Sequence, residues 1–328
     1  MMRKQQNIII GFSLLLIVMV IVVMVKDFFY RDQLNQKNPY EYNLDKLKRV
    51  DSKLIGYAEV QQIQAGEKEI KALATDKQNR IYVVAGESVM IYDAKGALQY
   101  SFMTGKKLSC ITIGPKGKIY LGLENHVEVW NRSGKLIRSW EASDAESLIT
   151  SIAVSDHSVF VADAGQWIVH QYDLNGKLVN RIGRKNVEKG IPGFFIPSPY
   201  FDVAIGREGQ LWVVNPGRHS LEAYDTKGNL ISSWSRSSMQ LDGFSGCCNP
   251  SHIAMLSDGS FVTSEKGIER VKIHQPSGDF KCVVAPPKLF KEGTRGLDLA
   301  VDTEDRILVL DPVKGLIRIF EKKDVERN

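Results

Sequence analysis

The hydrophobic pattern divides the chain into one long apolar run near the N-terminus and a series of short apolar segments that repeat along the rest. The run Ile8–Val25 contains 18 residues and no charge, which is typical of a membrane-spanning helix. After Lys53 the apolar segments are short and turn residues separate them. Such segments are typical of β-strands. The pattern therefore predicts one N-terminal span followed by an all-β domain.

One of these segments occurs six times, at spacings of 38 to 52 residues. Its first apolar residues are Ile81, Ile119, Val159, Leu211, Phe261 and Ile307. A ring-bearing residue follows each of them after 11 or 13 residues, namely Tyr92, Trp130, Tyr172, Tyr224, His274 and Phe320. In five repeats a glycine comes four residues later, where a turn requires a positive φ. The apolar position and the ring-bearing position thus repeat together at nearly constant separation, which indicates the blades of a β-propeller.

The third repeat carries a family resemblance. Its segments Val161–Asp163 and Gln171–Asp173, with the turn Asn175–Lys177, resemble NHL-repeat propellers, and the resemblance covers about residues 54–321. The chain also resembles a group of membrane-anchored bacterial NHL-repeat proteins in its segment Gly243–His252. The family implies four-stranded antiparallel blades around a central channel, used to bind proteins, RNA or small molecules. A shared fold does not choose among those uses.

We therefore predict an all-β fold, a six-bladed β-propeller of NHL-like repeats preceded by one N-terminal transmembrane helix. The expected parts are a membrane anchor (1–30), a polar linker (31–53), the propeller (54–321) and a C-terminal tail (322–328). The sixth repeat ends after its third strand, Leu316–Phe320. We expect Leu54–Ile63 to pair beside that strand and close the ring, which protects two sheet edges. The alternative is a loose strand before the domain.

The flanks of the apolar run predict how it is used. Lys26 and Asp27 follow it directly, with aromatic residues at 28–30, so it lacks the small-residue site of a cleaved signal peptide. Positive residues flank the run on both sides and barely decide its orientation. A short basic head before a large C-terminal domain favours a signal anchor. We expect a single-pass protein of the cell membrane with the propeller outside the cytoplasm.

Composition excludes some function classes. With 43% hydrophobic and 25% charged residues, the chain resembles an ordinary globular protein. Its net charge of +5 is small, and its Lys and Arg residues are scattered among acidic ones. Such a pattern does not neutralise successive phosphates, so nucleic acid is an unexpected partner. The four cysteines neither require nor exclude disulfides.

Polar residues end the second strand of four successive repeats. They lie four residues after the repeated apolar position and are Asp163, Asn215, Glu265 and Asp311. One interpretation is that each side chain accepts hydrogen bonds in its own turn. The other is a ring of oxygen ligands for a divalent cation. Six-bladed gluconolactonase-like enzymes use a comparable metal set, although the resemblance to them is architectural only.

The fifth repeat has the most unusual local chemistry. We expect one group of residues to line the principal ligand-binding mouth: Cys247, Cys248, Asn249, His252, Glu265, Lys266, Arg270 and Arg295. The adjacent cysteines can form a vicinal disulfide, bind a soft metal or remain buried thiols. Lys266, Arg270 and Arg295 suit a carboxylate or phosphate group, or simply solubilise turns. His252 can be a metal ligand or a hydrogen-bonded structural residue.

The sequence leaves the activity open. It contains no Ser-His-Asp order, phosphate-cradling glycine loop or paired-acid motif. The first hypothesis is a membrane-tethered recognition module that binds a protein or small ligand on its loop-rich face. The alternatives are a metal-dependent hydrolase or lactonase and a thiol-dependent redox protein.

Overall fold

The computed structural model describes residues 11, 14–26, 44–66, 69–140 and 144–323. The chain separates into two units, Met1–Leu44 and Asp45–Asn328. In the first unit residues 14–26 are helical. Within the described ranges, no helix has both the length and the apolar character needed to cross a membrane. The first residues of the expected span Ile8–Val25 lie outside the described ranges, and so does most of the expected linker. The span therefore stays a prediction.

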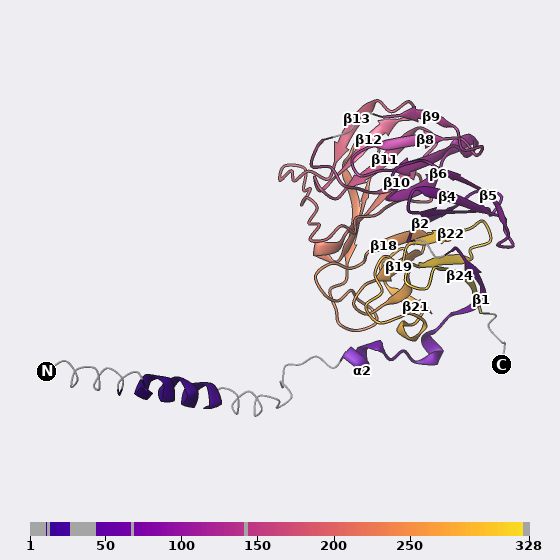
Figure 1. The fold of residues 1–328 in the computed structure, drawn as a ribbon. Coiled ribbons are helices and arrows are strands. Elements are labelled where there is room, and N and C mark those ends of the chain that lie inside the picture. The colour runs from indigo at the N-terminus through magenta and orange to yellow at the C-terminus, as the bar shows by residue number, and fades with distance from the viewer. Residues whose placement is uncertain (1–10, 12–13, 27–43, 67–68, 141–143, 324–328) are drawn as a thin grey trace. The chain divides into compact units, whose positions relative to one another are not determined.

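The described part of the second unit contains six four-stranded antiparallel sheets, and Figure 1 labels many of their strands. Each of the first five sheets runs outward from the channel in chain order. The first three are β2 (Ile70–Thr75), β3 (Ile81–Ala85), β4 (Ser88–Tyr92) and β5 (Leu98–Met103); β6 (Cys110–Ile113), β7 (Ile119–Gly122), β8 (Val127–Trp130) and β9 (Leu136–Ser139); and β10 (Ile149–Val154), β11 (Ser158–Asp163), β12 (Ile168–Asp173) and β13 (Leu178–Ile182).

The remaining sheets complete the ring. They are β14 (Val203–Ile205), β15 (Leu211–Asn215), β16 (Ser220–Tyr224) and β17 (Leu230–Ser235); β18 (His252–Met255), β19 (Phe261–Glu265), β20 (Arg270–His274) and β21 (Phe280–Ala285); and β22 (Leu299–Val301), β23 (Ile307–Asp311) and β24 (Leu316–Lys322) with β1 (Tyr57–Gln64). Apart from the helical residues 14–26, the helical segments of the described ranges are α2 (Leu44–Lys48) and the short 3-10 turns Ser52–Leu54, Pro115–Gly117, Pro216–Arg218 and Pro287–Leu289.

The innermost strands β2, β6, β10, β14, β18 and β22 contact one another in cyclic order, and β22 returns to β2. This closed order makes the domain a six-bladed β-propeller, as predicted. The second strands are almost continuous apolar runs because both of their faces are covered by neighbouring blades; every residue of β3 and β15 is buried. The core therefore lies between blades.

The predicted closure of the ring is confirmed. β1 pairs antiparallel with β24, from Tyr57 opposite Lys322 to Gln64 opposite Leu316. Arg318 Nη1 on β24 donates to Glu59 Oε1 on β1 at 2.8 Å, which adds an ion pair to the ladder. The outer strand of blade six therefore comes from the N-terminal side of the domain, and the last strand extends two residues beyond the expected Phe320.

The repeated turn glycine has a second role besides its conformation. Gly176 has φ 88°, and a Cβ there would lie 2.5 Å from the indole nitrogen of Trp140 in the preceding blade. Gly278 has φ 86°, and a Cβ there would meet Trp234 at 2.7 Å. The missing side chain therefore permits the left-handed turn and leaves room for the neighbour's aromatic ring.

Candidate functional site

Asp163, one member of the predicted oxygen ring, is fully buried and bonded within its own blade. Its Oδ1 accepts the backbone N–H groups of Leu148, Gly165 and Gln166 at 2.9, 3.0 and 3.1 Å. Its Oδ2 lies 3.1 Å from His170 Nε2 on the next strand. Burial raises the pKa of this carboxyl, but hydrogen bonds from His170 and the turn outweigh it and hold the pKa below its ordinary value.

Asn215 and Asp311 follow the same rule. Asn215 Oδ1 accepts the Phe195 N–H at 2.9 Å, and its amide donates to Glu222 Oε1 at 2.8 Å. Asp311 accepts from the Lys314 backbone at 3.2 Å and from Arg318 Nε at 3.1 Å. The two carboxylates thus join a turn to a side chain on the third strand, and Asn215 joins the loop before β14 to Glu222 on β16. This geometry matches the turn-stabilising interpretation and does not form a ligand ring. In the described ranges the three-residue cluster with metal-site spacing is a different one.

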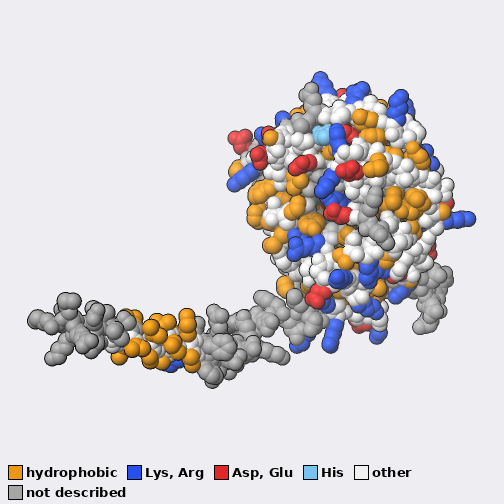
Figure 2. Space-filling view, in the orientation of Figure 1, with side chains coloured by type: hydrophobic (Ala, Val, Ile, Leu, Met, Phe, Trp, Pro, Cys, Tyr) orange, Lys and Arg blue, Asp and Glu red, His pale blue; other side chains and the backbone are white. Residues whose placement is uncertain are grey.

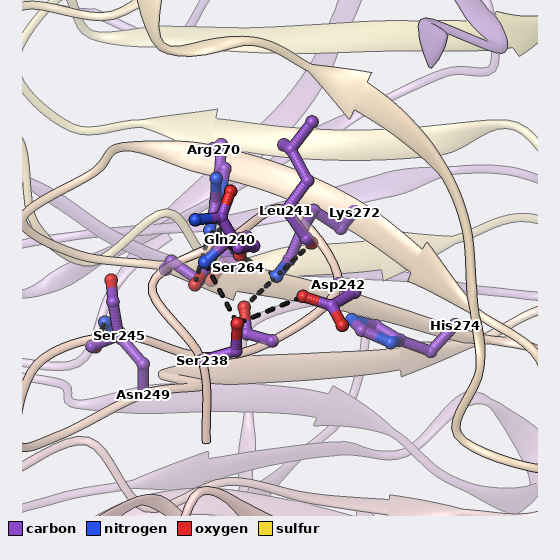
Figure 3. A network of polar contacts seen from close by, with 12 residues as sticks. Ser238, Gln240, Leu241, Asp242, Ser245, Asn249, Ser264, Arg270, Lys272 and His274 are labelled. Carbon is purple, nitrogen blue, oxygen red and sulfur yellow. Dashed lines mark hydrogen bonds and ion pairs between the residues drawn. The ribbon is translucent and has the colours of Figure 1, made fainter. Parts of the chain in front are cut away.

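Glu265, expected both in the ring and at the mouth, lies instead inside blade five. Its Oε2 forms ion pairs with Arg270 Nε and, at 3.2 Å, with Lys272 Nζ. The two cations also reach the preceding loop, where Arg270 Nη2 donates to the Gln240 carbonyl at 3.3 Å and Lys272 Nζ to the Leu241 carbonyl at 3.1 Å (Figure 3). Glu265 and Arg270 therefore fasten a loop and do not line the mouth, because both side chains, at the end of β19 and the start of β20, are buried in the packing.

A different set of six residues lies at equivalent positions of the inner strands. Four of them are paired with the residue three positions after the repeated apolar residue of the second strand, as in Cys110 opposite Gly122 and His252 opposite Ser264. Asp202 and Asp298 lie one residue before β14 and β22, and their carbonyls accept the N–H groups of Val214 and Leu310, which hold the same position in the second strand. All six line a cavity of about 270 Å³ in the central channel: Ala72, Cys110, Ser151, Asp202, His252 and Asp298. Polar side chains occupy the four positions of this ring that blades three to six supply.

Asp202, His252 and Asp298 converge in the channel from three consecutive blades. His252 Nδ1 lies 3.6 Å from Asp202 Oδ2 and 3.4 Å from Asp298 Oδ1. Both separations exceed an ordinary N–H···O hydrogen bond. One ligand atom from each side chain lies within 4.8 Å of the other two.

Backbone donors fix the two carboxylates. Asp202 Oδ2 accepts the Ile253 N–H at 2.8 Å, and Asp298 Oδ2 accepts the Leu73 N–H at 2.8 Å. Each carboxylate therefore links its own blade to the next, and Asp298 joins blade six to blade one. The second oxygen of Asp298 faces His252. The cluster is rigid because the backbone of the ring positions it.

Burial and charge perturb the acid–base chemistry of this cluster. Burial raises the pKa of Asp298 to about 6, a shift that His252 opposes and the Asp202 charge reinforces. Burial lowers the pKa of His252, but the nearby Asp202 and Asp298 carboxylates outweigh it, so the pKa lies above its ordinary value. Among the described residues, none forms a hydrogen bond with the buried Nε2 of His252. Burial thus favours a protonated Asp298, whereas the two carboxylates favour a protonated His252.

The same spacing fits a metal ion. In a tetrahedral shell with bonds of about 2.1 Å, neighbouring ligand atoms are roughly 3.4 Å apart. The two Nδ1–oxygen separations, 3.4 and 3.6 Å, are close to that value. One imidazole nitrogen and two carboxylate oxygens suit Zn²⁺ or Mn²⁺. The residues present therefore fit a divalent cation.

Part of the predicted mouth does come together beside this cluster. Lys266 Nζ donates to Ser198 Oγ at 2.8 Å and lies 4.6 Å from the centre of the Tyr200 ring. Tyr200 in turn meets the His252 ring nearly at right angles, with 5.8 Å between centres. Lys266 and His252 therefore belong to one neighbourhood, with Tyr200 between them. Sequence reasoning did not identify Tyr200.

The other predicted mouth residues divide between surface and interior. Cys247 is exposed and Cys248 is buried, with their sulfur atoms 2.9 Å apart. Asn249 is buried and serves the local turn, accepting the Lys266 N–H at 3.0 Å and donating to the Ser245 carbonyl at 2.7 Å. Arg295 is exposed, and its charge opposes the burial that raises the pKa of Tyr200.

The carboxylates at the channel escaped sequence reasoning because their strands are short. β14 and β22 have three residues each, too few to show a period. A weak signal does exist in the sequence around four inner strands. Each has one variable position followed by an apolar residue, Ala and a second apolar residue. That position holds Ser151, Asp202, His252 and Asp298. Aligning the first strands on this motif would have found these four polar positions of the ring.

Comparisons with known proteins establish the fold and leave the family open. No protein-family model and no curated protein matches the sequence. A streptogramin B lyase structure is similar with a TM-score of 0.59 and 10% identity, over 81% of this chain and 97% of the other. Virginiamycin B lyase from Staphylococcus aureus gives 0.55 and 10%, over 81% and 99%. A catalytically inactive variant of that lyase with quinupristin gives 0.55 and 12%, over 81% and 100%. These likenesses show a six-bladed propeller, and the NHL resemblance remains a prediction from sequence.

Proposed function

We propose that this chain binds a divalent metal ion in its central channel through Asp202, His252 and Asp298, and that the ion holds a small ligand at the channel mouth. The observation that carries the proposal is the convergence of three potential ligand atoms, with Nδ1–oxygen separations of 3.4 and 3.6 Å. Paired acids beside an imidazole are costly to bury without a cation, and a metal ion would relieve that cost.

The surroundings favour a small anionic ligand. The cavity of about 270 Å³ is near the lower end of small-molecule sites. Lys266 lies beside Tyr200 next to the cluster, and Arg295 is exposed near the same ring. A carboxylate or phosphate could bind the metal ion and be neutralised by these side chains. The proposal thus narrows the recognition module expected from sequence to a small-ligand binder.

Metal binding is tested by titrating chelator-treated protein with Zn²⁺ and Mn²⁺ in a calorimeter. We expect one high-affinity site in the unsubstituted protein. In Asp298→Asn the Kd for the metal ion should rise by at least about tenfold. The amide oxygen can still accept the Leu73 N–H, so the link between blades survives the substitution. Asp156→Asn is the matched control, because Asp156 is exposed on a turn of blade three. Absence of a stoichiometric site in the unsubstituted protein would refute the proposal.

A second candidate function is acid–base catalysis without a resident metal. The observation that favours it is the buried, unpartnered Nε2 of His252 with carboxylates near Nδ1, an arrangement that orients an imidazole as a general base. The solved structures with this fold include two described as lyases. Cleavage of a small substrate that persists in chelator, and is lost in His252→Gln, would favour this function over the first.

We also propose, from the sequence alone, that the run Ile8–Val25 tethers the protein to the cell membrane with the propeller outside the cytoplasm. The support is its 18 uncharged residues. Alkaline carbonate extraction and protease treatment of intact spheroplasts test it. Release into the carbonate supernatant would contradict the tether, and protection of the propeller from protease would contradict the orientation.

A further inference from the structure

The adjacent cysteines Cys247 and Cys248 form a thiol pair beside the channel mouth that the proposed metal site does not use. Their sulfur atoms are 2.9 Å apart, about 0.9 Å longer than a disulfide bond. Cys247 is exposed, whereas Cys248 is buried beneath it. An external reagent can thus reach one sulfur, and the second sulfur lies within reach of the first.

The neighbours of the buried sulfur favour its ionised form. Burial raises the pKa of Cys248, but hydrogen bonding with Cys247, then the influence of Ser198 and of the Lys266 charge, outweigh it, so this pKa lies below its ordinary value. The same contact with Cys248 raises the pKa of the exposed Cys247. Lys266 is held in place by Ser198 Oγ at 2.8 Å and by the Tyr200 ring at 4.6 Å. A thiolate beside a fixed ammonium group is the usual environment of a reactive cysteine.

The other two cysteines provide a contrast within the same chain. Burial raises the pKa of Cys110 to about 12, and burial also raises the pKa of Cys282. Cys110 lies in the channel ring and Cys282 in β21. Neither has a second cysteine next to it in sequence. Reactivity toward oxidants should therefore concentrate at Cys247 and Cys248.

We propose that Cys247 and Cys248 are a two-electron thiol–disulfide site whose co-reactant is a low-molecular-weight disulfide. Cys247 loses a proton to solvent and attacks one sulfur of the disulfide, which releases one small thiolate that takes up a proton. The Cys248 thiolate then attacks the Cys247 sulfur, and the second small thiol leaves. The protein loses two hydrogens and forms one S–S bond, while the co-reactant is reduced to two thiols.

A chain of side-chain contacts connects the thiol pair to the channel cluster. Oxidation consumes the Cys248 thiolate, which is a counter-charge for Lys266. Lys266 also contacts Tyr200, whose ring packs against His252. The thiol pair is nevertheless independent of the metal proposal, because it requires no ion and its chemistry can be measured with the channel site disabled by Asp298→Asn.

The test is to incubate the full chain with oxidised glutathione and then measure intact mass and free thiols. We expect the mass to fall by two hydrogens, two of the four thiols to disappear, and the peptide containing Cys247 and Cys248 to carry the change. Dithiothreitol should reverse it. In Cys248→Ser the reaction should stop at a glutathione adduct on Cys247, and Cys282→Ser, the matched control, should react as the unsubstituted chain does.

Two results would overturn the proposal. One is that all four thiols remain free after incubation with oxidised glutathione, under conditions in which other dithiol proteins become oxidised. The other is a stable glutathione adduct in the unsubstituted chain, because Cys248 would then fail to displace it. Lys266→Met should slow ring closure severalfold, because it removes a positive charge that favours the Cys248 thiolate. An unchanged rate of ring closure would show that Lys266 does not assist the reaction of Cys248.

Discussion

At the residue scale, His274 departs from the repeat that it belongs to. The equivalent position is aromatic in the other five blades, and His274 occupies the same kind of apolar environment. Its ring lies 5.2 Å from Trp234 and 5.1 Å from Phe244, measured between centres. Nδ1 contacts the Gly278 carbonyl at 3.3 Å, whereas Nε2 is buried without a partner. Burial, and then the nearby Lys272 charge, lower the pKa of His274 to about 3.

This shift makes stability depend on pH. The unfolded chain takes up a proton at His274 below an ordinary pKa of about 6.5, whereas the folded chain does so only near 3. Stability from the neutral ring is therefore present above pH 6.5 and is lost as pH falls from 6.5 toward 3, by an amount on the order of a few kcal/mol. His274→Phe should remove this component. Urea denaturation at pH 7 and pH 4.5 measures it, and an equal pH effect in the variant would contradict the explanation.

At the element scale, the loop before blade five is held by buried cations. Arg270 and Lys272 on β20 donate to the carbonyls of Gln240 and Leu241 and share Glu265 as their acid (Figure 3). All three ionic side chains are almost completely buried. Burial lowers the pKa of Lys272 to about 8, although the Glu265 charge opposes the shift. The loop therefore depends on one carboxylate that water cannot replace.

Removing that carboxylate should be costly. Glu265→Gln leaves two buried cations without their counter-charge, so we expect a loss of roughly 3–5 kcal/mol in the free energy of unfolding. Asp258→Asn breaks an exposed pair with Lys281 and should cost less than about 1 kcal/mol. Urea denaturation of both variants measures the difference. Equal costs would mean that the network is not the support of this loop.

The elements also show how far sequence reasoning reached. Second and third strands were predictable because each second strand is an apolar run. A ring-bearing residue such as Tyr172 or Tyr224 also follows it at a nearly fixed distance, in the third strand. First strands were not, because bulges and lengths of three residues hide their register. The expected ligand ring failed for a different reason. Spacing placed Asp163 at the right end of its strand, but it could not show that the side chain of His170, which is opposite Val161 in the ladder, contacts Asp163.

At the scale of the whole molecule, closure of the ring should control solubility. Without β1, the edge of β24 is unpaired and Arg318 loses Glu59, one of its two acidic partners. We expect a chain that begins at residue 44 to be monomeric and stably folded, and a chain that begins at residue 67 to aggregate. Size-exclusion chromatography and thermal unfolding compare the two. A stable monomer from the shorter chain would show that closure by β1 is dispensable.

Surface charge supports the view that recognition is local. Figure 2 shows acidic and basic side chains interspersed on the face in view, without one extended patch of a single sign. The chain as a whole carries a net charge of only +5. Affinity should then come from the channel mouth and fall only modestly between low and physiological salt.

The most direct test of the metal site is anomalous diffraction from crystals of the propeller, beginning at residue 44 and soaked in Zn²⁺. Such data locate the ion independently of activity or affinity. We predict one strong peak in the central channel, about 2.0–2.2 Å from His252 Nδ1 and from one carboxylate oxygen each of Asp202 and Asp298. The peak should disappear in Asp298→Asn crystals and persist in Asp156→Asn crystals. A channel without anomalous density, or an ion bound elsewhere with the three side chains unchanged, would contradict the account.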